Sequence, residues 1–289
     1  MVNGKRLSRR TFLKNSLFTI KALAALAGVG GLYSIFGERF WIQTKMVRLS
    51  YRRYPLSFAG MRIVQFSDTH IGKYYSLNRL EEVVELVQKQ KPDLICFTGD
   101  LFDSKFGEVS DDVIPILARL QADLGKFAVL GNHDMRLNAK RVVDVLERSG
   151  FTVLINQSRS IVRGHERLQV VGIDEIFHGK PNLPLAMKGV GRDDFVLLLA
   201  HEPDFADTAI SFPVDLQLSG HSHGGQIRIP FYGSIFIPDL AQKYPMGLYT
   251  FADSEFHVYT NRGIGTTLFP IRFNCRPEIT VFDLETKPS

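Results

Sequence analysis

Side chains that bind metal ions follow three apolar runs in the first half of this sequence. Asp68 and His70 come directly after MRIVQFS, Asp100 comes after DLICFTG, and Asn132 and His133 come after KFAVLG. Each interval between these sets has the length of one strand–helix–strand unit. Carboxylates, imidazoles and amides that recur at such positions predict a site for divalent metal ions.

The second half of the sequence delivers imidazoles in the same way. His201 follows the run FVLLLA, while His221 and His223 follow DLQLSG within the stretch GHSHGGQ. In an extended segment residues i and i+2 point to the same side, so we expect His221 and His223 to face one crevice. The flanking glycines are expected to let the backbone come close to that crevice. The other three histidines are expected to be surface or structural residues: His165, His178 and His257.

The segments that must position these side chains read as alternating strands and helices over residues 61–150. Helical periodicity begins after Ser76 and stops at Pro92, a second helix begins near Asp111, and a third covers residues 139–149. This alternation predicts a parallel sheet, and such sheets collect ligands at the carboxyl ends of their strands. Further along, short apolar runs such as LQVVGI predict a second region of sheet.

Charge is divided unevenly along the chain. The net charge is +5, yet the first sixty residues hold eleven basic residues and a single acid, Glu38. The rest of the chain is therefore acidic overall, which argues against a basic groove for nucleic acid. Two cysteines are too few for a disulfide framework. Cys96 lies in the apolar run LICF and is expected in the core, while its pairing with Cys275 stays open.

The N-terminus has the layout of an export signal. Arg9 and Arg10 lie within KRLSRRTFLK, and a weakly hydrophobic segment rich in Gly and Ala follows from Ser16 to Gly37. This pattern resembles the twin-arginine signal, whose receptor reads the paired arginines as an address. The alternative is an ordinary basic flank on a transmembrane helix. The sequence leaves open whether the segment is removed or stays as an anchor.

Basic residues continue between this apolar segment and residue 60. They alternate with aromatic residues, a composition that suits either an interfacial segment on anionic headgroups or a solvated linker. We therefore expect residues 1–60 to form a signal or membrane anchor followed by a basic linker. The basic residues concerned are Arg39, Lys45, Arg48, Arg52 and Arg53.

The ordered motifs DTH, GD, GNHD, AH and GHSH resemble the signature of the calcineurin-like metallophosphoesterases across residues 61–289. The paired arginines, GHSHGGQIRIP and NRGIG are more similar to the exported bacterial branch of that family. The resemblance implies that residues 61–289 form the catalytic domain. It also implies an α/β fold, a two-sheet α/β-β-α sandwich with a dinuclear metal site at strand ends.

The resemblance further implies two divalent metal ions per chain, and nitrogen and oxygen ligands suit Mn, Fe or Zn. Asp100 would be shared between the two ions. The first ion would be held by Asp68, His70, Asp100 and His223, and the second by Asp100, Asn132, His201 and His221.

The same resemblance implies roles in catalysis. A hydroxide between the metals would attack phosphorus, and His133 would give a proton to the leaving oxygen. Asp134 is expected to orient the His133 ring and favour its protonated form. Arg262 in NRGIG either clamps a substrate phosphate or pairs with an acid.

These features together predict a metal-dependent phosphoester hydrolase. We expect a phosphodiesterase or pyrophosphatase, exported by the twin-arginine machinery and acting while anchored at the membrane or in the cell envelope, outside the cytoplasm. The apolar loop Phe231–Tyr249 is either core or a rim for a lipid-linked substrate. The alternatives are a nuclease-type phosphodiesterase and a non-catalytic module that binds the cell envelope.

Overall fold

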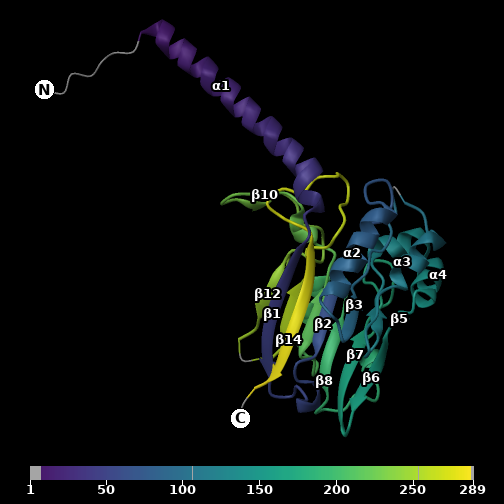
Figure 1. Cartoon of the computed structure of the whole chain (residues 1–289). Coiled ribbons are helices and arrows are strands. Elements are labelled where there is room, and N and C mark those ends of the chain that lie inside the picture. Colours follow the sequence, from purple (N-terminus) through teal and green to yellow (C-terminus); the bar gives the residue numbers. More distant parts are fainter. Residues whose placement is uncertain (1–7, 106, 253, 288–289) are drawn as a thin grey trace, which may run out of the picture.

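The computed structural model describes residues 8–105, 107–252 and 254–287 (Figure 1). Residues 1–7 of the expected signal and residues 288–289 of the expected catalytic domain lie outside the described residues. The rest folds around two six-stranded sheets, each flanked by helices on its outer face. This arrangement is the predicted two-sheet α/β-β-α sandwich.

The first sheet has the order β1-β14-β2-β3-β4-β5. Strands β2 to β5 run parallel, β14 is antiparallel to β2, and β1 is parallel to β14. The strands are β1 (Gln43–Tyr51), β2 (Arg62–Phe66), β3 (Leu94–Phe97), β4 (Lys126–Ala128), β5 (Thr152–Val153) and β14 (Glu278–Thr286). Its helices are α2 (Leu77–Lys89), α3 (Ile114–Leu117) and α4 (Asn132–Arg148).

The second sheet has the order β12-β13-β9-β8-β7-β6 and mixes parallel with antiparallel pairs. Its strands are β6 (Gln157–Arg163), β7 (Glu166–Gly172), β8 (Phe195–Leu199), β9 (Leu216–Ser219), β12 (Gly247–Thr250) and β13 (His257–Thr260). Helices α5 (Leu183–Ala186) and α6 (Ala206–Ala209) accompany it, and β10 (Arg228–Ile229) and β11 (Gly233–Ser234) form a separate hairpin. Short helical turns lie at η3 (Leu56–Phe58), η4 (Asp111–Val113), η5 (Pro203–Phe205) and η6 (His223–Gly225).

Three layers of buried side chains hold the sandwich together. The middle layer joins the sheets face to face, because Ile63 and Leu94 of the first sheet pack in one cluster with Leu197 and Leu216 of the second. A second cluster lies between the first sheet and α2 to α4, and a third lies under α5 and α6. Cys96 belongs to the middle layer as expected, and Cys96 and Cys275 are both free and buried. The cysteines therefore do not pair.

Residues 43–51 form strand β1, although the sequence pattern placed them in a basic linker. All nine residues pair with β14, and Val47 and Tyr51 point into the core. The basic residue Lys45 precedes Val47, and Arg48 lies between Val47 and Tyr51. These charged positions masked the pattern of a half-buried edge strand. The folded domain thus begins upstream of residue 61.

Helix α1 (Arg9–Leu32) projects away from the sandwich (Figure 1). It continues into the turns η1 (Tyr33–Gly37) and η2 (Glu38–Phe40), and the combined segment is long and apolar enough to cross a membrane. Ser8 caps the helix by accepting a hydrogen bond from the Thr11 N–H. By length and composition it is a candidate signal or anchor.

Candidate metal centre and active site

The loops that follow β2 and β3 present their polar side chains from a strained backbone. Asp68, His70 and Asp100 have φ angles of 52°, 46° and 60°, in the left-handed region that side chains with a Cβ rarely adopt. Hydrogen bonds stitch the two loops together, because the Asp68 N–H donates to Gly99 O at 2.9 Å and the His70 N–H to Asp100 O at 3.2 Å. Each such residue costs about 1–3 kcal/mol, which the surrounding fold must offset.

The GHSH segment approaches these loops closely. A Cβ on Gly220 would lie 2.1 Å from the Ser67 hydroxyl and 2.3 Å from Asp68 Oδ2, so glycine is required by the contact. The segment is a turn instead of the extended stretch that we expected. His221 and His223 have φ angles of 67° and 51°, and His223 starts the turn η6. Both rings nevertheless face the crevice.

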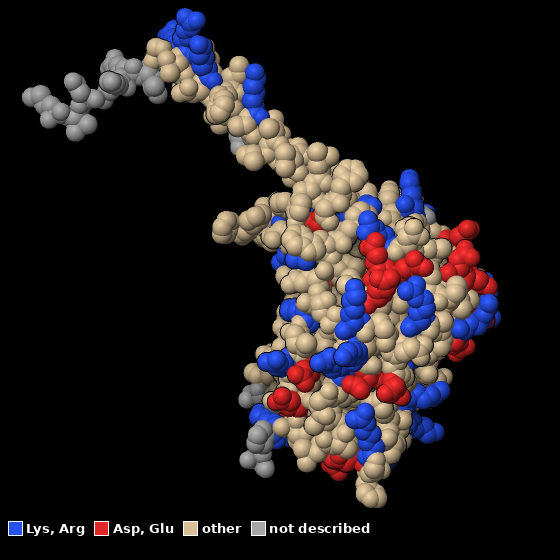
Figure 2. Space-filling view, in the orientation of Figure 1, with Lys and Arg blue, Asp and Glu red and all other residues tan. Residues whose placement is uncertain are grey.

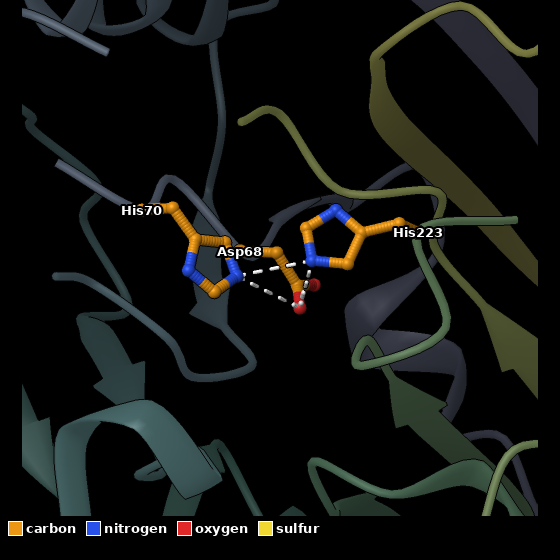
Figure 3. Close-up of side chains that lie close together, drawn as sticks. All are labelled: Asp68, His70 and His223. Carbon is orange, nitrogen blue, oxygen red and sulfur yellow. Dashed lines mark hydrogen bonds and ion pairs between the residues drawn. The ribbon is translucent and has the colours of Figure 1, made fainter. Parts of the chain in front are cut away.

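One buried cluster contains Asp68, His70 and His223 (Figure 3). The Nε2 atoms of His70 and His223 are 3.0 Å apart. Asp68 Oδ1 lies 3.5 Å from His223 Nε2 and 4.0 Å from His70 Nε2. Two loops distant in sequence, after β2 and after β9, therefore aim three ligand atoms at one point.

A second buried cluster contains Asp100, His201 and His221, with Asn132 beside them. His201 donates from Nδ1 to Thr98 O at 2.6 Å, which turns its Nε2 toward Asp100 Oδ2 at 3.3 Å. His221 Nε2 donates to Asp239 O at 2.9 Å, so its Nδ1 faces Asn132 Oδ1 at 3.0 Å. Each ring uses one nitrogen for a backbone carbonyl and keeps the other for the cluster, as metal-binding histidines do.

Asp100 joins the two clusters. Its Oδ2 lies 3.4 Å from His70 Nε2 and 3.3 Å from His201 Nε2. Among the described residues, the buried His201 Nε2 has no hydrogen-bond partner. An orphaned nitrogen beside a shared carboxylate fits a metal ion, and the two clusters fit a dinuclear divalent centre.

Burial sets the protonation of this centre. It raises the pKa of Asp68 to about 7 and lowers the pKa of His221 to about 4. Burial also disfavours the charged forms of Asp100 and His201, but their mutual attraction outweighs it. The pKa of Asp100 lies well below its usual value and that of His201 well above. Metal binding would require His201 to release its Nε2 proton.

His133 lies at the edge of the centre, and its side chain is 16% exposed. Its ring packs edge-on against His70, with centroids 4.5 Å apart. The Ser104 N–H donates to His133 Nδ1 at 3.1 Å, and Asp103 Oδ1 is 3.9 Å from the same nitrogen. Because Nδ1 accepts, a neutral ring carries its proton on Nε2. In the imidazolium form both nitrogens carry protons, and Ser104 Oγ, 3.0 Å from Nδ1, can accept one of them. That form could give its Nε2 proton to a leaving group.

Asp134 does not take the role that we expected from the sequence. Its Oδ2 accepts from the Asp100 and Gly131 N–H groups at 2.8 and 3.0 Å, and its Oδ1 accepts from the Leu101 N–H at 2.9 Å. The prediction that Asp134 orients the His133 ring is wrong, because its carboxylate is occupied by these backbone donors. Asp134 instead fixes the loop that carries Asp100.

The contacts of Arg262 match only one of the two roles that the sequence suggested for it. Its guanidinium pairs with the buried Glu278, with Nη2 at 2.5 Å from Oε2, and donates to Gln43 Oε1 at 2.9 Å. These contacts join the segment after β13 to the first sheet. The acid-pairing alternative describes this geometry, and the phosphate clamp does not.

Arg272, Asp103 and Ser104 are neighbours of the centre that the motifs did not reveal. Arg272 is fully buried, donates to the carbonyls of Gly265 and Cys275, and places Nη2 3.4 Å from His223 Nδ1. Asp103 and Ser104 surround Nδ1 of His133 as described above. Each is an isolated residue in a loop, so periodicity and strand-end position gave no signal for it.

A cavity of about 400 Å³ opens above the centre. Asp100, His133 and His221 form part of its wall. The rest of the wall is of mixed character, with the cations Lys105 and Arg136 and apolar residues such as Phe177, Phe236 and Leu268. The cavity can therefore admit an anionic group to the clusters and hold an apolar substituent beside it.

Comparisons with known proteins agree with this geometry. Residues 61–225 match the family model described as calcineurin-like phosphoesterase. The chain is 39% identical to the uncharacterized metallophosphoesterase YkuE of Bacillus subtilis over 98% of this chain and 99% of the relative. It is 34% identical to phosphodiesterase YaeI of Escherichia coli over 96% and 99%. A transmembrane protein with metallophosphoesterase domain from Danio rerio is 28% identical over 81% of this chain and 55% of the relative.

The two metal-type clusters, the shared carboxylate and the sandwich fold are thus accompanied by full-length similarity to metallophosphoesterases. Such an arrangement performs metal-dependent hydrolysis of phosphoesters. The chain belongs to the calcineurin-like phosphoesterase family and is a metal-dependent phosphoester hydrolase.

Proposed function

We propose that this hydrolase cleaves phosphodiesters or pyrophosphates and uses two divalent metal ions. The position of Asp100 Oδ2, within 3.4 Å of a histidine nitrogen from each cluster, carries the proposal of two ions. When bound, the ions lower the pKa of water and neutralise charge on phosphoryl oxygens. The residues that hold them are Asp68, His70, Asp100, Asn132, His201, His221 and His223.

The chain itself supplies the proton for the leaving group. His133 lines the cavity, and as an imidazolium it would donate from Nε2. Ser104 Oγ, 3.0 Å from Nδ1, would then accept from the other ring N–H, and Asp103 lies close enough to stabilise the positive charge. Asp134 contributes indirectly, because it holds the backbone from which Asp100 projects. His133 therefore donates the proton, and Asp134 positions the loop that carries Asp100.

The mixed wall of the cavity supports a substrate with two substituents on phosphorus. Lys105 and Arg136 can face a second charged group, and Phe177 and Phe236 can hold an apolar one. Similarity to a phosphodiesterase supports the same substrate class. A lipid-linked phosphodiester or pyrophosphate would use both kinds of wall.

We further propose that α1 targets the enzyme to the twin-arginine export route and holds it at the outer membrane face or in the cell envelope. Arg9 and Arg10 start the helix, and only 6% of its apolar window is buried in the protein. A relative named as a transmembrane protein supports membrane association.

The function can be tested with purified full-length protein and two chromogenic substrates. We expect Mn²⁺ to support hydrolysis of bis-p-nitrophenyl phosphate faster than of p-nitrophenyl phosphate, and a chelator to abolish both. Faster turnover of the monoester would contradict the diesterase proposal. A lack of chelator-sensitive activity on either substrate would favour a non-catalytic module, whereas rapid cleavage of DNA or RNA would favour a nuclease.

A further inference from the structure

We propose that the hairpin β10–β11 and the neighbouring loop at residues 268–269 rest on a lipid bilayer beside α1. We call this surface the apolar platform. It consists of Ile229, Phe231, Tyr232, Ile235, Phe236, Leu268 and Phe269, all of which are exposed. The surface assignment stands on its own, and its consequence for the substrate rests on the proposed function.

The apolar platform exposes much more hydrocarbon than a solvent-facing loop needs. Phe231 is fully exposed at 111%, Tyr232 is 76% exposed and Phe236 is 61% exposed. The hairpin sequence from Ile229 to Phe236 contains no charged residue. Figure 2 shows it as an uncharged tan projection next to the base of α1. Burying one such side chain is worth about 1.5–3 kcal/mol, so a set of this kind indicates a partner surface.

Hydrogen bonds fix the hairpin relative to the end of α1. The Arg228 N–H donates to Phe273 O at 2.9 Å, and Ile227 pairs with Phe273 in a β-bridge. The preceding residue, Arg272, donates its N–H to Ser34 O in η1 at 3.2 Å. The hairpin and the membrane-span candidate are thus tied to the same short segment, and a bilayer that holds α1 would lie beside the hairpin (Figure 1).

Interfacial side chains lie at the same end of the molecule. Trp41 is 57% exposed, and the Arg276 guanidinium lies 3.9 Å from the centroid of its ring. Arg39 donates to Pro270 O at 3.1 Å and lies 4.1 Å from the Phe40 ring, next to the loop of the apolar platform. Tryptophan and arginine are the residues that favour the headgroup layer. This composition selects an anionic lipid surface over a second copy of the chain.

The apolar platform is continuous with the active-site cavity. Phe236 and Leu268 belong to both, and His133 and His221 line the same cavity. A bilayer on the platform would therefore bring lipid headgroups to the cavity mouth. A phosphoester whose hydrocarbon chains stay in the membrane could then reach the metal clusters.

Tryptophan fluorescence can test the surface, because Trp41 is the single tryptophan of the chain. In a Trp41→Phe background, Tyr232→Trp reports on the apolar platform. Val162→Trp is the matched control, because Val162 is 62% exposed and belongs to β6, a strand that lies far from α1 (Figure 1). Full-length variants are reconstituted into phosphatidylcholine–phosphatidylglycerol vesicles with or without brominated lipid.

We expect brominated lipid to quench the Tyr232→Trp variant several-fold and the Val162→Trp variant little. Equal quenching of the two variants, or no quenching of either, would overturn the proposal. It would also be overturned if the Tyr232→Trp variant were not quenched and the protein formed oligomers that Phe231→Ser abolishes, because the platform would then bind a second copy of the chain. Turnover of bis-p-nitrophenyl phosphate is measured on the same samples. Quenching without turnover would refute the proposed function and leave the surface intact, so the two failures are distinguishable.

A second measurement addresses the substrate. The double variant Phe231→Ser/Tyr232→Ser should hydrolyse a soluble diester at the normal rate, because neither residue lines the cavity. Its rate on a vesicle-embedded phospholipid should fall several-fold. An unchanged rate on the phospholipid would overturn the substrate consequence.

Discussion

The two sheets contribute different chemistry to the centre. Loops of the first sheet bring both carboxylates, the amide of Asn132 and one imidazole, whereas loops of the second sheet bring three imidazoles. The first sheet brings His70, Asp100 and His133 together by itself, but the other two groups need both sheets. His223 completes the group of Asp68 and His70, and Asp100 completes the group of His201 and His221. The site therefore forms only when the sheets pack together, which couples folding of the sandwich to catalysis.

Asp100→Asn should have the largest effect on the division between the two sheets, because Asp100 follows a strand of the first sheet yet lies beside both clusters. We expect turnover of bis-p-nitrophenyl phosphate to fall about 10³-fold, a loss of about 4 kcal/mol. Bound metal, measured by mass spectrometry, should fall well below about two ions per chain. Asp283→Asn on β14 of the same sheet is the control and should keep both. Retention of both metals by Asp100→Asn would refute its shared role.

His133→Ala separates metal binding from proton donation within the first sheet. We expect about a 10²-fold loss of kcat, which is the usual size of a general-acid contribution, with metal content unchanged. The loss should be larger for an alkyl phosphodiester than for a nitrophenyl one, because the alkoxide needs the proton more. His165→Ala, on an exposed turn, should behave as the wild type. The same loss for both leaving groups would remove the acid role.

Arg262→Met tests a contact between the halves that lies outside the chemistry. Glu278 is 1% exposed and would lose its cation, so we expect the free energy of unfolding to fall by about 3 kcal/mol. The rate per folded molecule should stay unchanged. The double variant Arg262→Met/Glu278→Leu should recover part of the stability in urea denaturation. A large loss of kcat in the single variant would restore the substrate-clamp interpretation.

Asp103→Asn should give the smallest effect, because it removes one charge and keeps the shape of the side chain. A carboxylate 3.9 Å from His133 Nδ1 is too far for a hydrogen bond, so it stabilises positive charge on the ring only through the Coulomb interaction. We expect a loss of kcat of less than about tenfold, again larger for the alkyl diester. Any change of metal content would show that Asp103 acts on the centre and not on the ring.

The convergence of the strand-end residues was predictable from sequence, whereas their supports were not. Parallel strands must place Asp68, Asp100 and Asn132 at one edge, so a regular spacing is enough to bring them together. Arg272 and Asp103 act through single long-range contacts that leave no periodic trace. Asp134 shows that residues adjacent in sequence need not contact each other. Its carboxylate accepts from backbone N–H groups of the Asp100 loop and does not hold the His133 ring.

The same limit explains strand β1. Its partner β14 lies at the other end of the chain, so no local pattern marks the pair. Alternation was present in QTKMVRLSY, but its charged positions outweighed the buried ones in the composition of the segment. A strand at the edge of a sheet is the element in which charge and regular structure coexist most easily.

The pairing of β1 with β14 has a consequence for biosynthesis. In the described part of the first sheet, β14 is the only strand next to β1, and every other strand of that sheet is synthesised before it. Until then the nine residues that follow the helical segment have an open edge, which invites pairing with other chains. Synthesis of residues 278–286 is thus the event that allows this edge to close.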